Sequence, residues 1–144
     1  MTNPRSRGFP RAFFVDTSAF FAANTRDDER HERALQVLRL AVEFRARMVT
    51  TTYVLAESHA LHLNKLGWAS AAAFLRDADN NPAFAVVQPT LDDELRARAI
   101  IYRYTDKTFS LTDAISFAVM ERLRLREAFT FDRDFEQYGF AALG

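Results

Sequence analysis

Short apolar runs constrain the fold of this chain more than any other feature. Residues 12–15 are apolar at every position and stop at Asp16, which is typical of a strand buried on both faces of a sheet. Further strands are predicted at residues 48–51, 84–87 and 128–131. The segments between these runs are predicted as helices, at residues 27–47, 52–66, 70–78, 91–104 and 112–125.

This alternation of strands and helices predicts a three-layer α/β domain with a mostly parallel central β-sheet flanked by helices, because parallel strands need crossover connections. A chain of 144 residues, 49% of them hydrophobic, is long enough to bury one core of this kind. We expect the domain to span residues 12–144. Residues 1–11 contain two prolines and lack an apolar pattern, so they are predicted to form a loose N-terminal tail.

Composition excludes several classes of protein. The chain has no cysteine, so a bound metal must be held by oxygen atoms or by histidines. His31, His59 and His62 lack the spacing of a paired helical zinc site, and we interpret them as surface or packing residues. The 4 glycines are not clustered, which excludes a phosphate-binding glycine loop. No apolar run reaches the roughly 18 residues of a membrane span, so a cytoplasmic protein without a membrane partner is expected.

Two acidic residues directly follow predicted strands. Asp16 follows the first strand, and Asp132 follows the last, with Asp134 two positions later. Ligands of open parallel sheets bind beyond the carboxyl ends of the strands, so both positions suit a functional site. The alternative role for Asp16 is a helix cap. Of Asp132 and Asp134, one is expected to be a turn or cap residue, and Asp132 is expected to lie nearer the sheet.

Glu57 lies on a predicted helix. It shares a helical face with Val54 and Leu61, which predicts that its side chain points into the protein. An ionised carboxylate is costly there unless a cation or hydrogen bonds compensate, so this position favours a functional or metal-linked role. The alternative is an edge position at which the side chain reaches water or pairs with an arginine.

Asp113 lies in the first turn of the predicted helix 112–125. An acid there can simply stabilise the helix dipole. However, Asp113 is in register with Phe117 on the buried face, and Ser110 or Thr112 can cap the helix in its place. Asp113 is then free for another role, and both readings stay open.

These acids can converge at one end of the sheet, since two follow strands and two lie on helices that must pack beside it. Clustered carboxylates repel one another and raise their own proton affinity unless a divalent cation neutralises them. Mg²⁺, or alternatively Mn²⁺, is the natural partner of such oxygen ligands. Ions of this kind can activate water and stabilise the charge that develops at a phosphodiester.

The segments around these acids resemble the acidic motifs of PIN-domain nucleases. They read FVDTS at residues 14–18, TTYVLAE at 51–57, SLTDA at 110–114 and TFDRDF at 130–135. Their order and the chain length are most similar to the VapC-type toxins of bacterial toxin-antitoxin modules. The resemblance extends from about residue 13 to the C-terminus, so it covers nearly the whole chain.

The resemblance implies a metal-dependent endoribonuclease, the toxin of a type II module, that hydrolyses transfer or ribosomal RNA. It also implies a homodimer and a small antitoxin partner. Asp16 and Asp113 would be metal ligands, Glu57 would bind metal or position water, and Asp132 would complete the acidic ring. The supporting polar residues would be Thr17, Ser18, Thr112 and, in the outer part of the site, Asp134.

Other functions are weighed against this one. A PIN-like housekeeping RNA-processing nuclease would carry the same motifs. An aspartyl-phosphate phosphatase would use Asp16 as nucleophile, but that chemistry usually needs a second acid two residues on, where Ser18 stands. A non-catalytic RNA-binding domain is disfavoured by the intact acidic set. Basic and acidic residues balance at 19 each, so RNA contact depends on local arginines, such as Arg122, Arg124 and Arg126.

Overall fold

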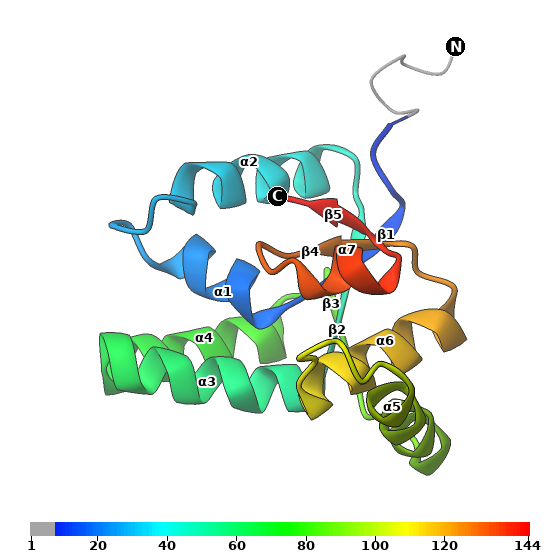
Figure 1. The fold of residues 1–144 in the computed structure, drawn as a ribbon. Coiled ribbons are helices and arrows are strands. Elements are labelled where there is room, and N and C mark those ends of the chain that lie inside the picture. The colour runs from blue at the N-terminus through cyan, green and yellow to red at the C-terminus, as the bar shows by residue number, and fades with distance from the viewer. Residues whose placement is uncertain (1–7) are drawn as a thin grey trace.

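The computed structural model describes residues 8–144. At its centre lies a five-stranded sheet in the order β3-β2-β1-β4-β5, and every neighbouring pair is parallel. The strands are β1 (Ala12–Val15), β2 (Arg47–Thr51), β3 (Phe84–Val87), β4 (Glu127–Phe129) and β5 (Ala141–Leu143) (Figure 1). The expected parallel α/β domain is therefore confirmed.

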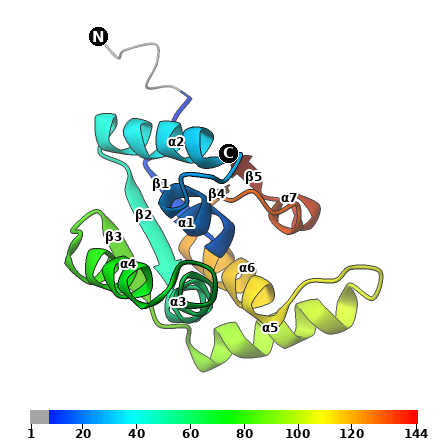
Figure 2. The same cartoon turned by 90° about the vertical axis from the view of Figure 1, so that its left-hand side faces the viewer.

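The helices connect these strands. They are α1 (Thr17–Asn24), α2 (His31–Glu43), α3 (Thr52–Leu66), α4 (Trp68–Asn80), α5 (Leu91–Arg103), α6 (Leu111–Leu123) and α7 (Asp134–Tyr138). Figure 2 shows α2 and α5 at opposite ends of the molecule. No helix in residues 8–144 has the length and apolar character that crossing a bilayer requires.

The two faces of the sheet are covered by different helices. Successive side chains of a strand point to opposite faces. In β1, Phe14 packs against Phe135 of α7, with ring centroids 6.0 Å apart. Its neighbour Val15 instead lines a cavity together with Ala19 of α1 and Leu38 of α2. Helices thus flank the sheet on both sides, and their burial of β1 explains why that strand is apolar throughout.

Helix prediction succeeded where apolar periodicity is long. The bounds of α3 match the predicted residues 52–66, and Gly67, a residue type that commonly ends helices, follows it with a φ of 92°. The helix α4, in contrast, begins at Trp68, so Ser70 lies inside it and does not cap it. The elements α1, α7 and β5 were not predicted. The middle of α1 is apolar on all sides, so it shows no helical periodicity, and the other two elements are too short for a periodic pattern to be recognised.

Helix α2 is shorter and rotated relative to the prediction. It begins at His31 rather than at residue 27, and its buried residues are Ala34, Val37 and Ala41. Val42 continues the apolar spacing of Ala34 and Leu38, which predicts it on the buried face, but it is 76% exposed. The prediction was wrong here because Val42 follows Ala41 by about 100° around the helix axis, which moves it off the contact face.

The predicted tail falls largely outside the described residues, since residues 1–7 are not among them. Within the described part, the Phe9 ring stacks on Phe44 with centroids 5.7 Å apart and meets Phe13 edge-on at 5.8 Å. Phe9 therefore packs against the hydrophobic core. The domain boundary at residue 12 stays a prediction.

Candidate active site

Asp16 lies at the carboxyl end of β1, in the middle of the sheet. Its backbone N–H donates to the carbonyl oxygen of Phe129 in β4 (3.1 Å), which holds the two strand ends together. Its carboxylate oxygen Oδ2 accepts hydrogen bonds from the hydroxyls of Ser18 and Thr130, both at 3.1 Å. The Asp16 side chain makes no capping hydrogen bond to α1. Its two hydroxyl partners orient the carboxylate away from the capping role.

Burial dominates the protonation of Asp16. The residue is only 4% exposed. Loss of water raises the pKa of its carboxyl from 3.8 to about 6, although hydrogen bonds from Thr130 and Ser18 act in the opposite direction. The negative charge of Glu57 adds to the increase. A shift of this size corresponds to roughly 3 kcal/mol against ionisation, which a bound cation would offset.

Asp113 has two roles in the structure. Its Oδ2 accepts from the backbone N–H of Ser110 (3.2 Å), while its own N–H donates to the Ser110 hydroxyl (3.0 Å). These bonds form a capping box at the start of α6. The expectation that Ser110 caps without help from Asp113 was therefore wrong, because the box needs both side chains. The capping bond uses Oδ2 and leaves Oδ1 for other partners.

Asp113, Asp132 and Asp134 form an acidic cluster, in which one carboxylate oxygen from each lies within 4.8 Å of the others. Burial, the Asp134 carboxyl and the charge of Asp16 raise the pKa of Asp113 to about 7. Asp132 is also a turn residue, since its Oδ1 accepts from the backbone N–H of Asp134 (3.0 Å). Asp132 and Asp134 therefore both belong to the cluster, although the sequence favoured Asp132 over Asp134.

Glu57 is exposed, so the prediction that it points into the protein was wrong. The buried face of α3 consists of Val54, Ser58 and His62, which are spaced by four residues. Glu57 follows Val54 by three residues and lies at the edge of this face, as the alternative reading proposed. Its charge nevertheless reaches Asp16. Glu57 is thus placed at the solvent rim of the site.

The predicted supporting residues differ in how closely they are connected to the acids. Thr17 is buried, and its hydroxyl lies 3.2 Å from the donating Ser58 hydroxyl in α3. The Ser18 hydroxyl accepts from the backbone N–H of Phe131 (2.9 Å) and so connects α1 to the loop after β4. Thr112 offers its backbone carbonyl to the Ser116 hydroxyl (2.9 Å). Within residues 8–144, its side chain is outside the hydrogen bonds that join these acids.

Thr130 was missed as a site residue. It is 1% exposed, and its hydroxyl donates to Asp16 Oδ2 (3.1 Å) and accepts from the backbone N–H of Asp132 (3.0 Å). One hydroxyl thus connects the acid after β1 with the loop after β4. The strand β4 ends at Phe129, so Thr130 begins that loop instead of extending the strand as predicted. The signal available in the sequence was a hydroxyl residue two positions before an acid at the end of a predicted strand.

The interpretation of His62 as a packing residue is confirmed. It is fully buried, and its ring stacks on Phe74 with centroids 4.7 Å apart. Its Nδ1 is 2.6 Å from the backbone carbonyl of Ser58, and its Nε2 is 3.1 Å from Asn24 Nδ2. Burial lowers the pKa of His62, so the ring is neutral at pH 7 and occupied by structural contacts.

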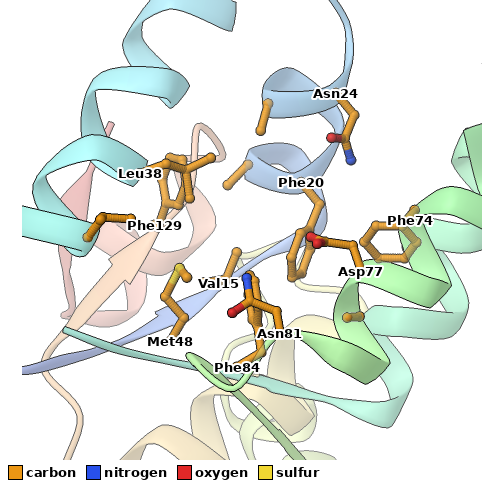
Figure 3. Close-up of a pocket in the computed structure, with 14 residues that line it drawn as sticks. Val15, Phe20, Asn24, Leu38, Met48, Phe74, Asp77, Asn81, Phe84 and Phe129 are labelled. Atoms are coloured by element: carbon orange, nitrogen blue, oxygen red, sulfur yellow. The ribbon is translucent and has the colours of Figure 1, made fainter. Parts of the chain in front are cut away.

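A separate cavity of about 200 Å³ lies between α1, α2, α4 and the sheet (Figure 3). Its lining is mainly apolar and includes Phe20, Met48 and Phe84, with Asn24 and Asp77 at its edge. A phosphodiester carries charge that such a lining cannot stabilise. The acidic cluster therefore suits a phosphodiester substrate better than this cavity does.

The donor set at the acids fits a divalent cation. It offers carboxylate oxygens from two elements, the start of α6 and the loop into α7, within 4.8 Å of one another, and Asp16 lies beside them. Hard oxygen ligands of this kind suit Mg²⁺ or Mn²⁺. The raised pKa values of Asp16 and Asp113 show that ionising both carboxyls is unfavourable without a nearby positive charge. A bound cation would lower both pKa values, because a carboxylate ionises more readily beside a cation.

These pKa values predict that the metal-free protein loses stability as pH rises. The folded protein holds protons on Asp16 and Asp113 up to about pH 6 and 7, whereas the unfolded chain releases them near 3.8. Between about pH 4 and pH 7, the folded state binds more protons, so the free energy of unfolding falls with rising pH. Calorimetry in EDTA should show a lower melting temperature at pH 8 than at pH 5. Added Mn²⁺ should raise it more at pH 8, and an equal increase at both pH values would contradict the prediction.

Comparison with known proteins agrees with the fold. The PIN domain family matches residues 13–141, and the chain belongs to this family. It is 34% identical over 129 residues to the 23S rRNA-specific endonuclease VapC20 of Mycobacterium tuberculosis, which covers 88% of this chain and 94% of that protein.

Solved structures give the same result. The crystal structure of Mycobacterium tuberculosis VapC20, described as a Sarcin-Ricin loop cleaving toxin, matches with a TM-score of 0.81 and 31% identity over 90% of this chain and 96% of that one. FitAcB from Neisseria gonorrhoeae matches with a TM-score of 0.65 and 16% identity over 92% and 96% of the two chains. At that identity, the second similarity shows the fold alone.

Proposed function

We propose that this protein is a metal-dependent endoribonuclease that hydrolyses RNA phosphodiester bonds as the toxin of a type II toxin-antitoxin module. The observation that carries the proposal is the group of carboxylates at the carboxyl ends of β1 and β4, with the oxygens of Asp113, Asp132 and Asp134 within 4.8 Å. Membership in the PIN-domain family and 34% identity to an endonuclease support it. A housekeeping RNA-processing nuclease remains the alternative.

In this proposal, Asp16 and Asp113 are the principal ligands of Mg²⁺, with Mn²⁺ as a substitute, and Asp132 and Asp134 complete the acidic ring. The cation would polarise the phosphodiester and lower the pKa of the attacking water. Ser18 and Thr130 both donate to Asp16 Oδ2, so they fix the orientation of this carboxylate. Glu57 at the solvent rim would orient the water and accept its proton.

The substrate is proposed to be ribosomal RNA. Sequence reasoning left transfer RNA and ribosomal RNA open, and the 34% identical relative is named as specific for 23S rRNA. A phosphatase acting through an Asp16 phosphoester is not favoured. The position two residues on is Ser18, whose hydroxyl donates to Asp16 Oδ2, and a hydroxyl is a far weaker acid or base than the carboxyl that this chemistry uses.

A small antitoxin and a second copy of the chain are proposed as partners, in a cytoplasmic setting. The antitoxin follows from the proposed toxin role, which is supported by the similarity to VapC20, described as a toxin. The outer face of α5 supports the homodimer, because Leu91, Leu95 and Tyr102 are 71%, 55% and 74% exposed there. Their spacing of four and seven residues places them in one stripe, and such stripes are typical of association surfaces. Light scattering of the purified protein measures whether its mass is that of one chain or two.

The proposal is tested with purified protein and ribosomal RNA. We expect cleavage with Mg²⁺ or Mn²⁺, no cleavage in EDTA, and recovery when the cation is added back. Asp16→Asn should remove several kcal/mol of transition-state stabilisation, which is a loss of roughly 10²–10³-fold in rate. The control Asp79→Asn changes an exposed acid in α4 and should cut normally. Cleavage that persists in EDTA and in Asp16→Asn would overturn the proposed function.

A further inference from the structure

An acidic site can accept RNA only if nearby cations offset the repulsion between carboxylates and phosphates. Arg122 was expected to contact phosphate, but the structure pairs it with Asp93 at 2.8 Å. Asp93 is fully buried, so Arg122 is held in a structural ion pair and this expectation was wrong. Another arginine, from a different part of the chain, contacts the acidic loop.

This arginine is Arg30, which directly precedes α2. Its guanidinium carbon lies 5.5 Å from the centroid of the Phe131 ring. Phe131 stands between Thr130 and Asp132, and its backbone N–H donates to the Ser18 hydroxyl that in turn donates to Asp16 Oδ2. Arg30 therefore contacts the loop after β4, which contains Asp132 and leads into α7 at Asp134.

Arg30 retains its charge and its hydrogen-bond donors in this position. Among residues 8–144, its guanidinium is in no ion pair within 4.0 Å. The nearby Asp28 carboxylate accepts from the backbone N–H of Arg30 (2.8 Å), which anchors the main chain instead. A ring contact of this kind engages the face of the guanidinium, so the N–H groups along its edge stay available. Those groups match the two oxygens of a phosphate.

We propose that Arg30 is a positioning residue that binds an RNA phosphate adjacent to the scissile one. The inference rests on the proposed ribonuclease function and adds a substrate contact to it. Phe131 holds the guanidinium beside the acidic loop without neutralising it. Because Arg30 contacts the aromatic residue next to Asp132 and not the acids, it fixes the path of the RNA backbone and takes no part in bond cleavage.

The test measures binding apart from cleavage. In the Asp16→Asn background, a fluorescein-labelled single-stranded oligoribonucleotide is titrated over a series of NaCl concentrations. Each phosphate contact contributes about 0.7 to the slope of log affinity against log salt for single strands. Arg30→Ala should lower the slope by this amount and weaken binding on the order of tenfold. Arg30→Lys, which keeps the charge, should retain the slope and weaken binding less.

Arg33→Ala is the matched control, because Arg33 lies in the first turn of the helix that Arg30 precedes and its guanidinium donates to Gln36 (3.2 Å). It should leave the slope unchanged. In the enzyme with Asp16 intact, Arg30→Ala should raise KM and leave kcat within about twofold, which separates positioning from chemistry. Melting temperatures of all variants check that each is folded.

The outcomes distinguish the two levels of the proposal. An unchanged slope in Arg30→Ala, or equal decreases in Arg30→Ala and Arg33→Ala, overturns the Arg30 contact and leaves the ribonuclease function standing. If the wild-type protein fails to cut RNA but Arg30→Ala still lowers the slope, the proposed function is overturned and the phosphate contact is supported.

Discussion

Asp113→Asn is expected to reduce RNA cleavage by roughly 10²–10³-fold, because loss of a charged metal ligand removes several kcal/mol of transition-state stabilisation. The fold should survive. The carbonyl oxygen of Asn can accept the Ser110 N–H that Asp113 Oδ2 accepts now, so the capping box is retained. The loss of activity should therefore come from the site and not from unfolding.

The same variant should show a pH-dependent gain in stability. Burial and the neighbouring acids raise the pKa of Asp113 to about 7. In the metal-free wild type, the carboxyl is neutral at pH 5 and ionised at pH 8, and the ionised form opposes folding. Asp113→Asn should melt at a higher temperature than wild type at pH 8 in EDTA, and by a smaller margin at pH 5, where only part of the loss has occurred.

Both measurements need an unrelated acid as control. Asp106→Asn removes a carboxylate whose side chain is 76% exposed and paired with Lys107 (3.4 Å), so neither cleavage nor the pH dependence of melting should change. If Asp113→Asn cuts RNA at the wild-type rate, Asp113 is not a ligand for the required cation. If its melting temperature falls at both pH values, the capping role outweighs the electrostatic one.

Arg122→Ala is expected to lower the free energy of unfolding by roughly 3 kcal/mol. The Arg122 guanidinium donates to Asp93 through Nε and Nη2, at 2.9 and 2.8 Å from its oxygens. These bonds hold the pKa of Asp93 below its ordinary value, so the carboxylate is charged at neutral pH. Asp93 also belongs to the capping box of α5 with Thr90. Removing Arg122 leaves a buried negative charge between α5 and α6.

For a chain of this length, the loss corresponds to a decrease of roughly 6–12 °C in melting temperature. Arg96→Ala is the control, since Arg96 pairs with Asp92 across an exposed turn of α5 and should cost at most about 1 kcal/mol. Combining Asp93→Asn with Arg122→Ala should recover part of the stability, because the unpaired charge is gone. A decrease no larger than that of Arg96→Ala would show that the pair contributes little.

The fold was predictable where sequence patterns are long or uninterrupted. The run at residues 12–15 and the helix at 52–66 are long enough, or apolar enough, to exclude alternatives. Short elements such as β5 are defined by their pairing with a neighbouring strand, here Ala141–Leu143 beside Glu127–Phe129, and pairing leaves little trace in three residues. The rotation of α2 depends on packing against α1 and the sheet, which periodicity alone does not specify.

The acids of the candidate site were predictable individually, but their environments were not. Strand ends and motif order pointed to Asp16 and Asp132, and the structure places each at the expected sheet edge. The burial of Glu57 was mispredicted because one helical face is wide enough to include residues at its exposed margin. The Thr130 hydroxyl could not be ranked without coordinates, since its role depends on contact with Asp16, 114 residues away in the chain.

The capping box of α6 gives Asp113 a structural role that does not depend on catalysis. Ser110 and Asp113 hold each other at the first turn of this helix, so local folding alone would preserve both residues after activity was lost. An inactive descendant could therefore keep Asp113 merely to start its helix. The Asp16 side chain makes no capping hydrogen bond and is costly to bury, so evolution has less reason to keep this carboxylate once catalysis ends. In sequences of unknown relatives, Asp16 would be the more reliable marker of a working enzyme.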